Sequence, residues 1–224
     1  MPIADVPRPR GVDRLPVDHR GYPVPWFAAW LDEDDNEVPP GQGKPEFRVV
    51  GSDRLYRALT LARCWICGLP TARDVAFVAG PMCAINRTSA EPPSHVECAD
   101  YAARVCPFLT HPKATRREAN MPAGEDPPGI MLRRNPGVAL VWITRRNAWR
   151  LRRTGDGGVL CDIGEPTETR WYHAGQPATR AQVDASIEEG LPELEKHVRG
   201  TNERLELARL IHRASRHLPK DSAA

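Results

Sequence analysis

The stretch CWICG (residues 64–68) places two cysteines three positions apart, and SHVEC (residues 94–98) places a histidine and a cysteine at the same spacing. Thiolates and imidazoles bind zinc tetrahedrally, and structural zinc sites are usually built from two closely spaced ligand pairs. The sequence therefore predicts a bound zinc ion. The predicted ligands are Cys64, Cys67, His95 and Cys98, with Cys83 and Cys106 as alternates.

The second ligand pair is predicted to lie at the start of a helix. Two prolines (residues 92–93) keep the chain non-helical up to Ser94. Ser94 and Glu97 have the spacing of a capping box, so the helix should begin at His95. His95 and Cys98 would then share one face of the first turn. A C-x2-C knuckle, a strand hairpin and a ligand pair on a first helical turn together resemble a treble-clef zinc site.

Further stretches resemble a group of proteins from actinobacteria and their phages, and the likeness runs over most of the chain. These stretches are GYPVPWF (21–27), CWICG (64–68), FVAGPMCAINRTSAEPPSH (77–95), CADYAARVCPFL (98–109) and ATRAQVDASIEEGLPEL (178–194). The resemblance implies a bacterial or phage setting in the cytoplasm and a zinc site. It implies no activity for any residue.

The composition is that of a soluble globular protein, with 41% apolar and 27% charged residues and a net charge of +2. No stretch approaches the 18 or so consecutive apolar residues of a membrane-spanning helix, so no membrane partner is expected. The N-terminal residues lack the apolar segment of a secretory signal. We therefore expect a cytoplasmic protein whose six cysteines are thiols or metal ligands rather than disulfides.

Composition and periodicity divide the chain into five segments. They are an extended arm rich in proline and aromatic residues (1–46), a zinc-binding module (47–110), a proline-rich linker or long loop (111–137), a β-meander (138–178) and C-terminal helices (179–224). The predicted fold class is α+β, with a treble-clef-like zinc centre, a small antiparallel sheet and a helical C-terminus. The aromatic rings of the arm are expected to pack against the core.

Turn and capping residues indicate where loops and helices begin and end. The stretch from Gly80 to residue 93 is expected to be a long, proline-stiffened loop. Thr179 and Gln182 have the T-x-x-Q spacing of a capping box that opens a helix. Gly190 and Pro192 are expected to end that helix. A last helix is predicted over 192–217, with a glycine at position 200 that could split it.

The meander contains the stretch WITRRNAWRLRRTG, residues 142–155, in which guanidinium groups converge on one face of a strand. The predicted nucleic-acid-binding residues are Arg145, Arg146, Arg150, Arg152 and Trp149, the last of which would stack on an unpaired base. The competing interpretation is a solvated sheet face on which these arginines pair with nearby carboxylates. The leading hypothesis is a non-enzymatic accessory protein with a structural zinc ion and a nucleic-acid partner.

Two other functions stay open at this point. One is a zinc-supported hydrolase or an HNH-like nuclease that uses Asn86, Glu91 or Glu97 beside the metal. The H-x-E of His95 to Glu97 is also found in zinc deaminases, but here the C-x2-C precedes it instead of following it. The other is a protein-interaction module. Arg87 is a candidate for binding a phosphate or carboxylate from the loop beside the metal. The oligomeric state is not predicted.

Overall fold

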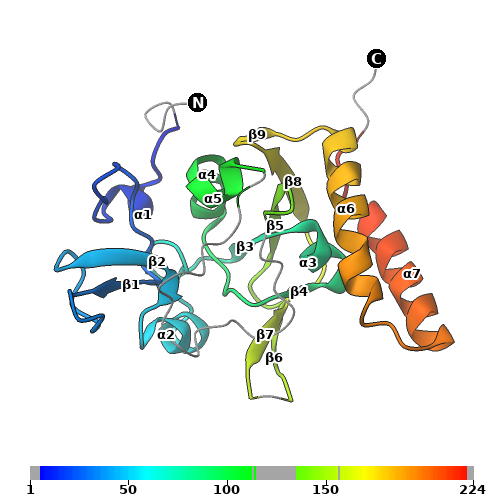
Figure 1. The fold of residues 1–224 in the computed structure, drawn as a ribbon, viewed down its shortest axis with the longest axis horizontal. Helices are drawn as coiled ribbons and strands as arrows, with labels where there is room; N and C mark the ends of the chain where they lie inside the picture. The colour runs from blue at the N-terminus through cyan, green and yellow to red at the C-terminus, as the bar shows by residue number, and fades with distance from the viewer. Residues whose placement is uncertain (1–5, 113, 115–134, 156, 221–224) are drawn as a thin grey trace.

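In a computed structural model of the chain, residues 6–112, 114, 135–155 and 157–220 are described. These residues form helices and antiparallel sheets, which confirms the predicted α+β class (Figure 1). Most of the predicted linker, residues 115–134, lies outside the described residues. None of the helices in the described part of the chain combines the length and apolar composition needed to cross a bilayer.

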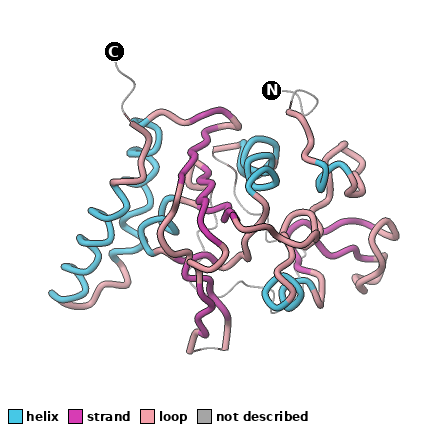
Figure 2. The backbone as a smooth tube through the Cα atoms, turned by 180° about the vertical axis from the view of Figure 1, so that it is seen from behind, coloured by secondary structure: helices cyan, strands magenta, loops and turns pink. Residues whose placement is uncertain are grey.

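The N-terminal part forms a small layer beside the central sheet (Figures 1 and 2). It contains helix α1 (Arg10–Asp13), the antiparallel strands β1 (Ala28–Leu31) and β2 (Lys44–Val50), and helix α2 (Arg54–Thr60). Trp30 of β1 is buried, and the ring of Phe27 stacks on that of Trp65 with 4.9 Å between centroids. Aromatic residues of the predicted arm thus cover apolar surface, as burial of large rings favours.

The central sheet has the strand order β3 (Asp74–Ala79), β5 (Ala139–Arg145), β8 (Glu168–His173) and β9 (Gln176–Pro177). β5 pairs with a strand on each side and is buried on both faces, which explains its continuous apolar sequence. Residues 139, 141 and 143 face the alanines of helix α4 (Val96–Val105), whereas Leu140 and Trp142 face the opposite side, which is covered by helix α6 (Arg180–Glu195).

The predicted β-meander is wrong as a topology, although its four strands are present. β6 (Arg150–Arg153) and β7 (Val159–Asp162) leave the central sheet and form a separate three-stranded sheet with β4 (Thr88–Ser89). The reason is that both edges of β5 are already occupied by β3 and β8, so the next two strands must pair elsewhere.

The predicted long loop over residues 80–93 is also wrong. Pro81 occupies the first position of helix α3 (Pro81–Asn86), where its missing N–H costs nothing, and β4 follows directly. Ser94 does not cap α4, because its backbone pairs with Ala76 of β3, and His95 takes the N-cap position without a capping side-chain bond.

At the C-terminal end, the capping box of Thr179 and Gln182 is confirmed at the start of α6. The expected break at Gly190 and Pro192 is wrong, because α6 continues through both residues. A Cβ atom at position 190 would lie 2.9 Å from the methyl group of Met82, so the glycine permits close packing of α6 on α3. The predicted interruption at position 200 is confirmed, since Gly200 is the N-cap of helix α7 (Thr201–Ser215).

Candidate metal centre

The first ligand pair lies on a tight backbone turn between α2 and β3. The N–H of Cys64 donates to the carbonyl of Leu69, and the N–H of Gly68 donates to the carbonyl of Cys64, each at 2.8 Å. Gly68 has a φ of +74°, and a Cβ atom there would lie 2.5 Å from the ring of Trp26. Only glycine tolerates both constraints at this position. The turn therefore holds the side chains of Cys64 and Cys67 together.

The second ligand pair lies at the start of α4. The two backbone hydrogen bonds between Ser94 and Ala76 measure 2.8 and 2.9 Å and fix the chain just before the helix to β3. His95 is the N-cap residue, and Cys98 lies in the first turn. Ala99 and Ala103 of the same helix are fully buried against the sheet. The position of the second pair is thus set by the packing of α4 on the central sheet.

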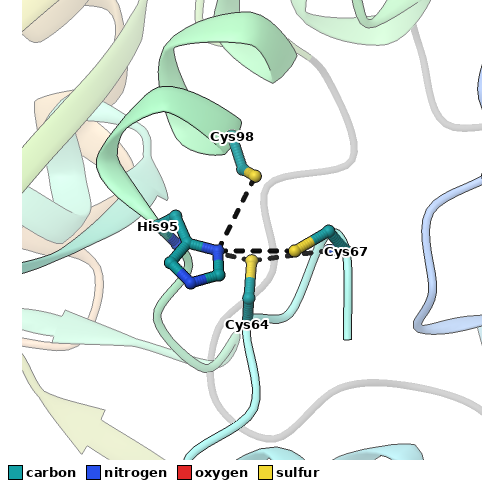
Figure 3. A group of neighbouring side chains, drawn as sticks. All are labelled: Cys64, Cys67, His95 and Cys98. Carbon is teal, nitrogen blue, oxygen red and sulfur yellow. Dashed lines mark hydrogen bonds between the residues drawn. The ribbon is translucent and has the colours of Figure 1, made fainter. Parts of the chain in front are cut away.

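These two segments bring one sulfur or nitrogen atom from each of the four residues to within 4.8 Å of the others (Figure 3). We call this group the Cys3His cluster; it consists of Cys64, Cys67, His95 and Cys98. The distances from His95 Nδ1 are 3.4 Å to Cys67 Sγ and 3.9 Å to Cys98 Sγ. A tetrahedral zinc ion with bond lengths of about 2.0–2.3 Å separates its ligand atoms by about 3.5–3.8 Å. The cluster is compatible with a zinc site.

Hydrogen bonds around the cluster orient its ligand atoms. His95 Nε2 lies 2.9 Å from the carbonyl oxygen of Pro70, so the proton on Nε2 is donated there and Nδ1 faces the thiols. The Sγ of Cys64 accepts the backbone N–H of Cys67 at 3.4 Å and that of His95 at 3.3 Å. Partners of this kind fix the histidine tautomer and stabilise thiolates in zinc sites.

The proton affinities within the cluster are strongly perturbed by these contacts. Burial alone would raise the pKa of the Cys64 thiol, but hydrogen bonds from Cys67, Cys98 and His95 lower it. Hydrogen bonds to Cys64 and then Cys67 raise the pKa of His95 to about 11, and the same two thiols raise the pKa of Cys98. A metal ion would release protons from the cluster on binding.

The surroundings of the cluster are apolar. Cys64 and Cys98 are buried among side chains of α1 and α4, including Val12 and Tyr101. Helix α1 approaches so closely that a Cβ atom at Gly11 would lie 2.8 Å from Cys67 Sγ. Four ligand atoms in such a pocket have the number and environment of a structural zinc site rather than one with an open position.

Neither alternate cysteine belongs to the cluster. Cys83 is on α3, and Cys106 is the residue that ends α4. In the described part of the chain, the four-residue cluster is the one group of histidine, cysteine and acidic side chains arranged to hold a metal. Cys83 and Cys106 are therefore not needed to complete it.

The candidate catalytic residues lie outside the cluster as well. Asn86 ends α3, Glu91 follows β4, and Glu97 is on the first turn of α4; all three are exposed. Among the described residues, no carboxylate joins the four ligand atoms. The geometry thus offers no specific support for a hydrolase or nuclease site at this position.

Arg87 is buried and bonded within the protein. Its guanidinium donates to the carbonyl of Gly164 at 2.8 Å, pairs with Glu165 at 3.0 Å and contacts His217 Nε2 at 3.3 Å. It also lies over the ring of Trp142, 4.6 Å from the centroid. An external phosphate or carboxylate would have to displace Glu165. This network could not be predicted from the sequence, because its members are up to 130 positions apart.

The predicted nucleic-acid residues surround the base of the hairpin β6–β7. Arg145 pairs with Asp74 at 2.7 Å and Arg152 with Asp162 at 3.0 Å, as the solvated-face interpretation expected, whereas Arg146 and Arg150 are exposed. In the described part of the chain neither of these two forms an ion pair with a carboxylate.

Trp149 is half-buried. Its ring packs edge-to-face on that of Phe77, with 5.9 Å between centroids, and lies against the core cluster of the central sheet.

Comparison of the chain with protein-family models, with curated proteins and with solved structures gave no match.

Proposed function

We propose that the chain is a zinc-stabilised accessory protein that binds nucleic acid. Zinc has a structural role in this proposal, in a variant of the treble clef. The cluster combines a cysteine knuckle with a ligand pair at a helix start, as treble-clef sites do. Here β3, α3 and β4 lie between the two pairs instead of a simple hairpin. Four ligand atoms in an apolar pocket support a closed site that holds two chain segments together.

The observation that supports nucleic-acid binding is the basic hairpin, which we define as β6, β7 and the described residues between them (154, 155, 157 and 158). It projects from the body of the protein (Figures 1 and 2), and all four residues of β6 are exposed. Residues 145–162 contain five arginines and two aspartates, a local net charge of +3 in a chain whose total is +2. Such a concentration of guanidinium groups favours phosphate backbones.

Fluorescence anisotropy with labelled DNA and RNA at two salt concentrations tests this function. We expect binding at micromolar protein that weakens steeply as salt increases, because displaced counterions drive the association. Binding that is absent at low salt, with zinc-loaded and folded protein, would contradict the proposal. Pull-down with and without nuclease treatment would then show whether a protein is the partner instead.

A further inference from the structure

The basic hairpin has the shape of a freestanding two-stranded ribbon. β4 pairs with β7 only at Cys161 and Asp162, near the base. Beyond that point β6 and β7 pair only with each other, Arg152 with Leu160 and Arg153 with Val159. The turn is closed by the N–H of Thr154, which donates to the carbonyl of Gly158 at 2.9 Å. The outer part of the hairpin is therefore accessible from both faces and along the outer edge of β6.

Both faces of β6 carry groups that can contact a nucleic acid. Arg150 and Arg152 lie on one face, and Leu151 and Arg153 lie on the other. Arg152 forms an ion pair with the half-exposed Asp162. Ion pairs on the surface contribute little to the free energy of folding. Arg153 forms no ion pair within the described part of the chain. Leu151 is 49% exposed, so its apolar side chain is available for contact.

The hairpin lacks the chemistry by which proteins hold single strands. Unpaired bases are bound by stacking on aromatic rings, which contribute about 1–3 kcal/mol per base. Residues 150–162 contain no aromatic residue, and the neighbouring Trp149 is packed against Phe77. Arginines without a stacking ring suit a nucleic acid whose bases are already paired.

The width of the hairpin distinguishes between types of duplex. Two paired strands lie about 4.8 Å apart, and a strand of four residues extends about 13 Å along the ribbon. The major groove of B-form DNA is about 12 Å wide and admits a two-stranded ribbon, whereas the major groove of A-form RNA is too narrow for side chains to read. Arginine pairs with the O6 and N7 atoms of guanine, and an exposed apolar side chain can contact the methyl group of thymine.

At the base of the hairpin a shallow surface depression is lined by Arg73, Arg145, Arg146 and Asn147. The backbone N–H of Arg146 donates to the carbonyl of Arg73 at 2.9 Å, which joins the two basic segments. The depression thus adds three arginines beside the base of the hairpin.

We infer that the basic hairpin enters the major groove of B-form duplex DNA, with Arg150, Arg152 and Arg153 as its contacts. The inference rests on the proposed function and specifies its substrate class. The binding measurement therefore uses one sequence in three forms: duplex DNA, the corresponding single strand and duplex RNA. Duplex DNA is expected to bind at least about tenfold more tightly than either of the others at moderate salt.

A triple variant locates the contact on the hairpin. It combines Arg150→Ala, Arg152→Ala and Arg153→Ala and should weaken duplex binding by about tenfold or more. The slope of the logarithm of the binding constant against the logarithm of the salt concentration should become shallower by up to about 2.7, which is about 0.9 for each lost phosphate contact. The matched control carries Arg199→Ala, Arg204→Ala and Arg209→Ala, which remove three exposed arginines near or on α7. It should bind within about twofold of the unmodified chain. Far-ultraviolet circular dichroism and zinc content verify that both variants fold.

Methylated duplexes test the groove. Methylation of guanine N7 blocks the major groove and should weaken binding, whereas methylation of adenine N3 in the minor groove should leave it unchanged.

The possible outcomes separate the two proposals. Equal or tighter binding of the single strand or duplex RNA, or insensitivity to N7 methylation, would overturn the major-groove inference and leave nucleic-acid binding intact. Duplex binding that the hairpin variant retains would overturn the assignment of the hairpin. Failure of all three nucleic acids to bind would overturn the proposed function itself.

Discussion

His95 and Cys98 are three residues apart, yet the chain positions them in different ways. His95 is held before the helix by the Ser94–Ala76 backbone pair and by its own bond to the carbonyl of Pro70. Cys98 is carried by the helix itself. Removal of one thiol leaves a site with three ligands. A single substitution should therefore affect the whole cluster.

Cys64→Ser and Cys98→Ser test this at the residue scale. Zinc content measured by elemental analysis should fall from one ion per chain to well below one, and the thermal midpoint should fall, because the binding energy of a structural zinc ion contributes directly to folding. Cys83→Ser, which changes a thiol outside the cluster, is the matched control and should retain its zinc. Retention of a full zinc ion by both cluster variants would refute the assigned ligand set.

Gly68→Ala probes the knuckle without touching a ligand. Position 68 has a φ of +74°, and the added methyl group would lie 2.5 Å from Trp26. We expect a loss of about 2–4 kcal/mol in the free energy of unfolding, from the left-handed backbone and from overpacking. Urea denaturation measures it. Gly155→Ala, where a Cβ atom meets nothing within 4 Å, should change stability little, and equal effects of the two substitutions would contradict this account.

At this scale, much of the cluster could be predicted from spacing alone. Two ligand pairs with three-residue separation indicated which side chains converge, because short spacing is what a knuckle or a helical turn requires. The partner of His95 could not be predicted, since the carbonyl of Pro70 carries no side-chain signal. Nor could the burial of Trp149, because it depends on β3 lying beneath it.

At the scale of elements, hydrogen bonds to the residues that follow α7 connect this helix to the central sheet. The carbonyl of His217 accepts hydrogen bonds from Thr169 at 2.8 Å and from the indole of Trp171 at 2.9 Å. The imidazole ring of His217 packs edge-to-face on the ring of Trp142, with 5.3 Å between centroids, and lies near Arg87 and Glu165. The docking of the C-terminal helix thus depends on a half-buried imidazole.

This contact should make stability depend on pH. Burial, and then the charge of Arg87, lower the pKa of His217 below its usual 6.5, so the unfolded chain takes up a proton that the folded chain excludes. The contribution of neutral His217 to the free energy of unfolding is complete above about pH 6.5. It is lost as the pH falls from there through the lowered pKa of the folded state, by at most about 1.4 kcal/mol per pH unit. The carboxyl group of Glu165, whose pKa is also lowered, loses its contribution only in more acidic solution.

Urea denaturation between pH 7.5 and pH 5 measures this dependence. His217→Gln should flatten the decline in that range, whereas His212→Gln, which changes an exposed histidine on α7, should not. Identical pH profiles for the unmodified chain and His217→Gln would contradict the assignment.

Elements with a strong local signal were predicted well. β5 is an apolar run within the segment predicted to form strands, and the start of α6 is encoded by its capping box. The errors concern pairing between distant segments. Ser94 has the sequence of a cap, but its backbone is taken by Ala76 of β3, and β4 forms only because β7 lies beside it. Long-range pairing of this kind has no local signature.

For the whole molecule, the Cys3His cluster joins the N-terminal layer to the central sheet. Cys64 and Cys67 lie on the turn that packs against α1 and Trp26, while His95 and Cys98 belong to the helix on the sheet (Figures 1 and 3). The α+β class followed from the sequence, but the division into separate sheets did not, because it depends on which edges remain open after β5 has paired.

The central claim is that one zinc ion links these two parts. X-ray absorption at the zinc edge, on the purified full chain after elemental analysis, tests it most directly. We predict one zinc ion per chain, with three sulfur neighbours at about 2.3 Å and one nitrogen neighbour at about 2.0 Å. Protein that is free of metal and fully folded, or zinc surrounded mainly by oxygen, would contradict the claim.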